Sequence, residues 1–108
     1  MKFKVHVIDD AEQDIFEIYH YILASGSPLN AEKLLGELEQ TIISLEHMPE
    51  RGHMPPELKR IGVYGYREIH LKVYRIIYEI IGHDVFVHCI LDGRRDLQDL
   101  LRQRLLRL

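Results

Sequence analysis

The sequence contains a single cysteine, Cys89, among its 108 residues. One cysteine cannot form an intrachain disulfide, and it excludes the zinc sites that several thiolates build. No apolar run approaches the ~20 residues that span a bilayer. Residues 1–5 also lack the long apolar region and the cleavage site of a secretory signal peptide. These absences favour a reducing compartment, and we expect a cytoplasmic protein with no membrane contact.

The sequence also has little that would bind a nucleotide or a metal ion. Gly62 and Gly65 lie in a loop without the lysine and the strand–loop–helix context of a phosphate-binding loop. His47 and His53 flank a segment rich in proline and glycine, but their spacing fits no metal motif, and we expect no third or fourth ligand close to them. We therefore expect neither a cofactor nor a metal site.

Positive charge is scarce in the first half of the chain. Residues 1–50 carry three basic and ten acidic residues, a net charge of −7, whereas residues 51–108 carry eleven basic and seven acidic residues, a net charge of +4. Clustered positive charge attracts anions. The second half is therefore the better candidate for contact with an acidic partner.

Residue periodicity in the first half predicts one strand and two helices. Residues 3–8 alternate apolar and polar side chains, as in a strand with one buried face. Asp10 and Gln13 have the spacing of a capping box, so a helix of about four turns should begin there. Ser27 and Pro28 predict the N-cap and the first position of a second, amphipathic helix. The two helices should pair as an antiparallel hairpin.

The second half predicts a loop-rich connection, three strands and a short helix. Prolines and glycines interrupt residues 48–65. Three segments are then rich in β-branched and aromatic residues, which predicts three strands of an antiparallel meander at residues 66–70, 74–81 and 85–91. Apolar residues recur at helical spacing in residues 96–106.

These elements predict one α+β domain over residues 1–108, in the order β-α-α-β-β-β followed by a short C-terminal helix. The antiparallel helical hairpin should pack on a small curved antiparallel sheet, because this buries both amphipathic stripes and one face of the sheet. The position of the first strand in that sheet stays open.

Short motifs in the second half share one order and spacing with a known family. They are Leu45-x-x-x-Pro49-x-x-Gly52, Tyr66-Arg67-Glu68-Ile69, Tyr74-Arg75-x-x-Tyr78-Glu79, and the basic turn Asp92-Gly93-Arg94-Arg95-Asp96. With the helical hairpin before them, they resemble the RelE/ParE toxin superfamily, and within it the ParE branch. The resemblance covers nearly the whole chain.

The resemblance implies the toxin of a type II toxin–antitoxin system, neutralised by a bound antitoxin. RelE-like members cleave messenger RNA on the ribosome, whereas ParE-like members poison DNA gyrase. Cleavage without a metal needs a general base, an acid and cations. Neither histidine nor tyrosine follows His88, and the net charge of −3 suits a ribosome surface poorly. We therefore favour gyrase; the alternatives are a ribosome-dependent mRNA endoribonuclease and an inactive homologue that only binds an antitoxin.

The site residues that follow from this interpretation fall into three groups. The target-binding candidates are the basic residues Arg67, Arg75, Arg94, Arg95 and Arg102. The antitoxin-binding candidates are the apolar and aromatic residues Phe16, Tyr19, Leu23, Ile43, Tyr74 and Tyr78. If the protein is a nuclease, its catalytic residues would be Arg67, His88 and Arg94. The partners would be a cognate antitoxin and gyrase, or the ribosome with its mRNA, with higher-order toxin–antitoxin complexes as a further assembly.

Several of these residues also have a purely structural interpretation, and Tyr74 and Tyr78 could be core residues of their strand. His88 could be a packed sheet histidine that shares a face with Phe86 and Ile90. Arg94 and Arg95 could form ion pairs with the flanking acidic residues at the start of the last helix. Arg67 and Arg75 could be solvated or paired strand charges.

Overall fold

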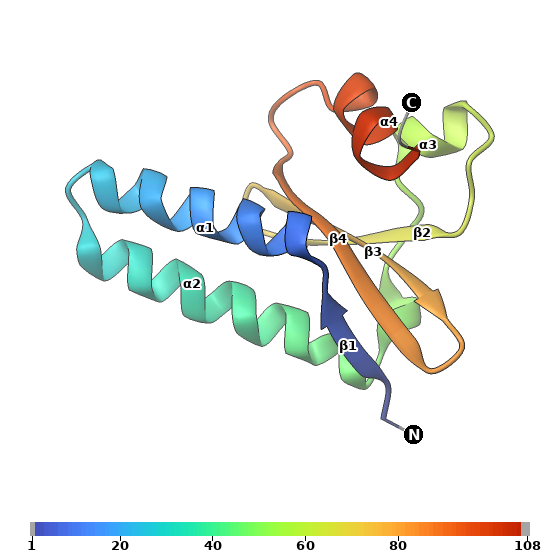
Figure 1. The fold of residues 1–108 in the computed structure, drawn as a ribbon, viewed down its shortest axis with the longest axis horizontal. Coiled ribbons are helices and arrows are strands. Elements are labelled where there is room, and N and C mark those ends of the chain that lie inside the picture. Colours follow the sequence, from blue (N-terminus) through green and yellow to red (C-terminus); the bar gives the residue numbers. More distant parts are fainter. Residues whose placement is uncertain (1, 107–108) are drawn as a thin grey trace.

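The chain forms a helical hairpin that covers one face of a four-stranded sheet (Figure 1). The computed structural model describes residues 2–106. Its main elements are β1 (Lys4–Val7), α1 (Asp9–Ala24), α2 (Pro28–Ile43), β2 (Tyr66–Leu71), β3 (Tyr74–Ile81), β4 (Asp84–Asp92) and α4 (Gln98–Leu106). The predicted α+β fold and its element order are confirmed. None of the helices within residues 2–106 is long and apolar enough to cross a membrane.

The connection between α2 and β2 has more structure than the sequence predicts. Two 3-10 turns, Ser44–Glu46 and Pro49–Arg51, are followed by the short helix α3 (Pro56–Arg60). Pro49 and Pro56 each occupy the first position of their turn or helix, where a missing N–H costs nothing. Pro49 and Pro56, which lie in the predicted loop, therefore start short helical segments.

The sheet has the strand order β1-β4-β3-β2. β2, β3 and β4 form the predicted antiparallel meander. β1 lies at the sheet edge and pairs in parallel with β4, with Val5 opposite Val85. The helical hairpin thus serves as part of the long crossover that a parallel pair requires.

Both helices of the hairpin begin without a side-chain cap. α1 starts at Asp9, because Ile8 is still extended and occupies the cap position itself. The predicted capping box of Asp10 and Gln13 is therefore wrong, and Asp10 lies in the first turn, where negative charge favours the helix dipole. Ser27 and Pro28 take the predicted N-cap and first positions of α2, although the Ser27 side chain makes no cap bond.

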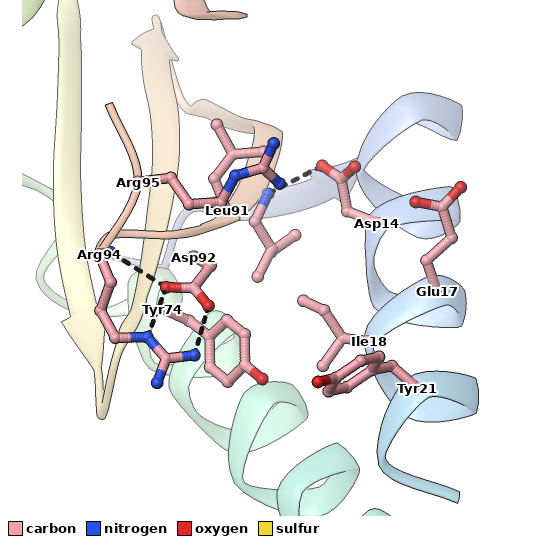
Figure 2. A pocket seen from close by; sticks show the side chains of 10 residues that line it. Asp14, Glu17, Ile18, Tyr21, Tyr74, Leu91, Asp92, Arg94 and Arg95 are labelled. Atoms are coloured by element: carbon pink, nitrogen blue, oxygen red, sulfur yellow. Dashed lines mark hydrogen bonds and ion pairs between the residues drawn. The ribbon is translucent and has the colours of Figure 1, made fainter. Parts of the chain in front are cut away.

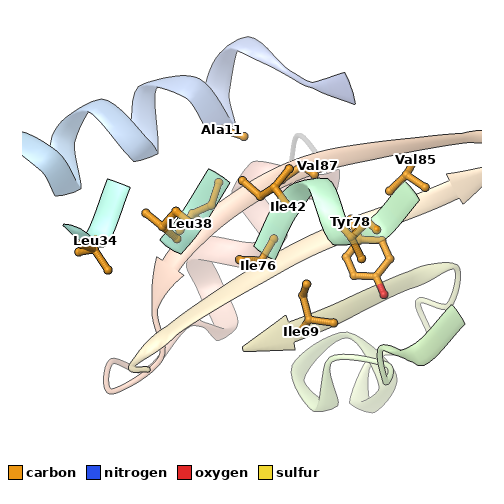
Figure 3. Packing of buried hydrophobic residues seen from close by; sticks show 11 residues of the cluster. Ala11, Leu34, Leu38, Ile42, Ile69, Ile76, Tyr78, Val85 and Val87 are labelled. Carbon is orange, nitrogen blue, oxygen red and sulfur yellow. The ribbon is translucent and has the colours of Figure 1, made fainter. Parts of the chain in front are cut away.

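Two apolar clusters hold the sheet between helices. On one face the hairpin contributes Leu38 and Ile42, which pack with Ile76 and Val87 of the sheet (Figure 3). On the other face α3 and α4 pack on the sheet through the buried residues Leu58, Ile77, Cys89, Leu91, Leu97 and Leu101. Burying each leucine-sized side chain stabilises the fold by about 1.5–3 kcal/mol. The sheet is thus covered on both faces.

A β-bulge at His88 changes which residues of β4 share a face. The pairing passes from Ile77 opposite Cys89 to Tyr78 opposite Val87, so His88 has no residue opposite it. An extra residue of this kind shifts the alternation of the strand. Ile90 therefore joins the hairpin-side cluster, and the prediction that it shares a face with His88 is wrong.

Candidate functional site

A groove of about 360 Å³ lies between α1 and the ends of β3 and β4 (Figure 2). It collects acidic, basic, aromatic and aliphatic side chains from these three elements and from the turn after β4. The lining residues are Asp14, Glu17, Ile18, Tyr21, Tyr74, Ile90, Leu91, Asp92, Arg94 and Arg95.

One helix face and one strand end build the groove. Asp14, Ile18 and Tyr21 lie four and three residues apart on α1, so they share one face of the helix. Tyr74 begins β3 and pairs with Asp92 at the end of β4. Tyr21 and Tyr74 lie near each other in the groove (Figure 2), and Tyr21 is 74% exposed. This spacing along α1 is the signal that could have identified the groove wall from the sequence.

Arg94 is oriented by Asp92 at the mouth of the groove. Its Nε donates to Asp92 Oδ1 at 3.0 Å and its Nη2 to Oδ2 at 2.6 Å, and its backbone N–H also donates to Oδ1. These bonds lower the pKa of Asp92 to about 2. The Arg94 side chain remains 71% exposed. The ion pair considered from the sequence is therefore present, and it leaves the guanidinium accessible.

Arg95 differs from its neighbour. It is exposed, and its side chain has no hydrogen bond or ion pair with any residue in the described range 2–106. Asp96, the other acidic neighbour, instead accepts a bond from the backbone of Gln98 and so starts α4. The turn after β4 thus offers one cation oriented by hydrogen bonds and a second, exposed cation whose side chain makes no hydrogen bond or ion pair within residues 2–106.

The groove floor depends on an ion pair that the sequence analysis missed. Arg104 of α4 donates to both carboxylate oxygens of Asp14, at 3.1 and 2.8 Å. Asp14 also accepts from the backbone N–H of Ile90 at 3.0 Å, and Arg104 donates to the carbonyl of His88. These contacts join α1, β4 and α4 behind the groove.

Of the two interpretations of Arg75, the structure shows the paired strand charge and leaves no exposed cation for a target. This side chain is buried and lies between two carboxylates: its Nη1 is 2.5 Å from Glu57 Oε2, and its Nη2 is 2.6 Å from Glu68 Oε2. Hydrogen bonds from Arg75 hold the pKa of Glu57 below its usual range. Burial raises the pKa of Glu68, but bonds from Arg75 and His70 outweigh it. Arg75 therefore fastens α3 to the sheet and is not available to a target.

Tyr78 is also buried, which does not fit its predicted role in antitoxin binding. Its hydroxyl donates to the carbonyl of Pro49 at 2.5 Å. Arg67 reaches the same segment and donates to the carbonyls of Glu50 and Gly52 at 3.1 and 2.9 Å. Both side chains hold the Pro49–Arg51 turn against the sheet.

The three residues of the nuclease hypothesis have partners in different parts of the fold. Arg67 binds the 49–52 segment, whereas Arg94 binds Asp92 beside the groove. His88 is 20% exposed, with its Nε2 2.9 Å from Glu79 Oε1 and its ring edge-on to Tyr66. No described contact joins any two of these three residues.

The remaining antitoxin candidates lie on the hairpin, where Phe16 and Tyr19 both contact the ring of His20. Phe16 is 57% exposed and lies against His20, and Ile43 is exposed at the end of α2. The Tyr19 hydroxyl donates to Glu32 at 2.7 Å and so ties the two helices together. Leu23 is half-buried near the tip of the hairpin, whereas Arg102, a target candidate, is exposed on α4.

Comparison with known proteins agrees with this fold. No curated protein matches the sequence. A solved chain of the chromosomal ParDE TA system from P. aeruginosa is similar in fold, with a TM-score of 0.69 and 18% identity, over 82% of this chain and 94% of that chain. The family model for the ParE toxin of type II toxin-antitoxin system, parDE, matches residues 5–97. The protein therefore belongs to the ParE toxin family of type II toxin–antitoxin systems.

Proposed function

We propose that this toxin inhibits DNA gyrase through the Arg94-Arg95 turn. The single observation that supports this proposal best is the exposure of two adjacent arginines, one oriented by Asp92 and the other without a side-chain hydrogen bond or ion pair among residues 2–106. An exposed pair of cations attracts acidic surfaces and DNA phosphates alike. Gyrase works on DNA, so a basic turn suits its DNA-bound cycle. Action on gyrase also implies a cytoplasmic location.

The groove beside the turn is our candidate for antitoxin binding. Tyr21, Ile18 and Tyr74 supply apolar surface, and Arg95 supplies a charge that an acidic side chain could pair. A second hollow of about 450 Å³ shares Tyr74 and continues toward the hairpin tip. An antitoxin segment of mixed apolar and acidic character, folding as it binds, would fit this surface. It would cover the Arg94-Arg95 turn and thereby neutralise the toxin.

Ribosome-dependent cleavage is the less favoured hypothesis. His88 is the candidate base, but its Nε2 is bonded to Glu79 and its ring contacts Tyr66, which packs against the α3/α4 cluster, so it is not among the residues that line the groove. A general base must reach the proton that it abstracts, directly or through one water. His88 in this position is better suited to a structural role.

A gyrase supercoiling assay tests the proposal. Wild-type protein should inhibit supercoiling, and the Arg94→Ala/Arg95→Ala double variant should lose that inhibition while its thermal stability hardly changes, because exposed ion pairs contribute little. The matched control is Lys59→Ala/Arg60→Ala, which removes two adjacent exposed cations from α3. It should inhibit as the wild type does.

A translating extract, probed for cleaved messenger, runs beside the gyrase assay. Cleaved messenger with unaffected gyrase would replace the proposal with the nuclease hypothesis. Inhibition of neither system, together with normal growth on expression, would identify an inactive homologue. An equally inhibitory Arg94→Ala/Arg95→Ala variant would move the target-binding surface elsewhere.

A further inference from the structure

Two histidines and one glutamate meet at the outer edge of the sheet, away from the groove. The ligand atoms of His53, Glu68 and His70 all lie within 4.8 Å of one another. His70 Nε2 is 2.6 Å from Glu68 Oε1, and His53 Nε2 is 3.8 Å from Glu68 Oε2. The sequence suggested that no further ligand is close to His53, and folding corrects this by bringing Glu68 and His70 beside it.

Backbone pairing places these side chains together. Glu68 and His70 are two residues apart on β2, so they point to the same face of the strand. His53 forms an isolated antiparallel bridge with Glu68, with backbone N···O distances of 3.2 and 2.8 Å. Residues directly opposite in such a bridge also share a face. The three ligands are therefore held by the main chain and do not depend on side-chain contacts alone.

From this arrangement we infer that His53, Glu68 and His70 form a binding site for a divalent transition-metal ion, and that this ion is Zn²⁺. Two imidazoles and one carboxylate are ligands that zinc prefers, whereas Mg²⁺ and Ca²⁺ prefer oxygen ligands only. Metal–ligand distances of about 2.0–2.2 Å place tetrahedral ligand atoms roughly 3.3 Å apart. The present separations of 2.6 and 3.8 Å lie on either side of that value.

Exposure allows the adjustment that a metal ion would require. The His53 and His70 side chains are 63% and 52% exposed, so their rings can turn without displacing the core. Glu68 is 1% exposed and stays fixed. Water has access from the solvent side and can complete the fourth position, as in sites with three protein ligands.

The charges around Glu68 allow a metal cation to bind there, although Arg75 lies close. Arg75 donates to both Glu68 oxygens, at 2.8 and 2.6 Å, and this holds the carboxylate in one orientation. Each carboxylate oxygen has two lone pairs, so one on each oxygen remains for a metal ion. Glu57 pairs with Arg75 from the other side and offsets its positive charge. Such hydrogen bonds to a ligating carboxylate are the usual outer shell of a metal site.

Zinc titration of tag-free protein, in competition with a chromophoric chelator, tests this inference. Wild-type protein should bind one Zn²⁺ per chain, and Mg²⁺ should not compete. His53→Ala and His70→Ala should each weaken binding at least about tenfold, since even outer-shell changes have effects of that size. The matched control is His47→Ala, an exposed histidine outside the cluster, which should bind as the wild type does.

Thermal melting gives a second readout, because a ligand that binds only the folded state raises Tm. Zn²⁺ should raise the Tm of wild type and His47→Ala, and not that of the other two variants. If either alanine variant fails to fold, His53→Gln and His70→Gln replace them. Zinc binding unchanged in the cluster variants, or absent from the wild type, would overturn the inference.

Discussion

Arg67, Glu68 and Arg75 carry much of the likeness to the toxin family, and all three make bonds inside the chain. Arg67 donates to the carbonyl of Gly52, and Glu68 accepts two hydrogen bonds from Arg75. These motif residues therefore have a structural role in the fold, and they are weaker candidates for contact with a partner. Of the five target-binding candidates, Arg94, Arg95 and Arg102 are exposed, and two of these lie in the turn after β4.

Gly52 illustrates this structural role. A Cβ at this position would collide with the Tyr78 hydroxyl and lie 2.8 Å from the Glu68 carbonyl oxygen. Gly52→Ala should lower the free energy of unfolding by about 1–3 kcal/mol, as overpacking does, measured by urea denaturation. Gly36→Ala is the control: its Cβ meets nothing within 4 Å inside α2, so it should stabilise by about 0.5–1 kcal/mol. A Gly52→Ala protein as stable as wild type would contradict the close approach.

Glu57 should make stability depend on acid pH. Its pKa is lowered by the hydrogen bonds from Arg75, so its contribution is present above the usual carboxyl value of 4.5 and is lost as pH falls below it. Glu57→Gln should therefore be less stable than wild type at neutral pH, and the gap should narrow toward pH ~3. Denaturant unfolding across this pH range measures it.

The control for this titration is Glu39→Gln, which removes an exposed carboxylate on α2 that has no ion-pair partner among the described residues. Its stability difference from wild type should stay small at every pH. If the stability difference between wild type and Glu57→Gln does not change with pH, the Glu57 carboxylate has the same pKa in the folded and the unfolded state, and the prediction is wrong.

At the scale of elements, α4 depends on one ion pair as well as on its apolar face. Leu101 packs under the sheet, and Arg104 binds Asp14 with little exposure of either side chain. Arg104→Ala should cost about 1.5–3 kcal/mol, the range for hydrogen bonds to charged groups. Hydrogen exchange should quicken in α4 and remain slow in β3. Arg102→Ala, an exposed change on the same helix, should leave both rates unaltered.

Sequence periodicity predicts the helices and strands that bury one face and expose the other. β3 was predicted at its observed bounds, and α2 begins at Pro28 as expected. Other features depend on contacts far away in the chain. The bulge at His88 appears only once β3 and β4 are paired, and the burial of Tyr78 requires the Pro49–Arg51 turn to lie over its hydroxyl. No local sequence pattern predicts either of these contacts.

At the scale of the molecule, the charge asymmetry of the sequence takes a spatial form. The groove joins the acidic first half, through Asp14 and Glu17 of α1, to the basic turn of the second half. The arginines of this site were predicted from the sequence, whereas the spacing on α1 marks a helix face but does not tell which part of the second half it will meet. A partner in the groove therefore meets apolar surface with charges of both signs at its rim.

This mixture predicts that antitoxin and target respond differently to salt. Antitoxin binding in the groove should rest mainly on apolar contact, with Tyr21, 74% exposed, as a central aromatic residue. Tyr21→Ala should weaken antitoxin binding at least tenfold, about 1.4 kcal/mol, measured by calorimetry with the cognate antitoxin. Tyr64→Ala, a 62% exposed tyrosine outside the groove, should bind normally. Raising the salt concentration from about 0.1 to 0.5 M should weaken gyrase inhibition far more than it weakens antitoxin binding. Salt screens the exposed charges of the arginine turn, but it does not screen the apolar contacts in the groove. Antitoxin affinity that falls with salt as steeply as gyrase inhibition does would show that the groove binds its partner chiefly by charge.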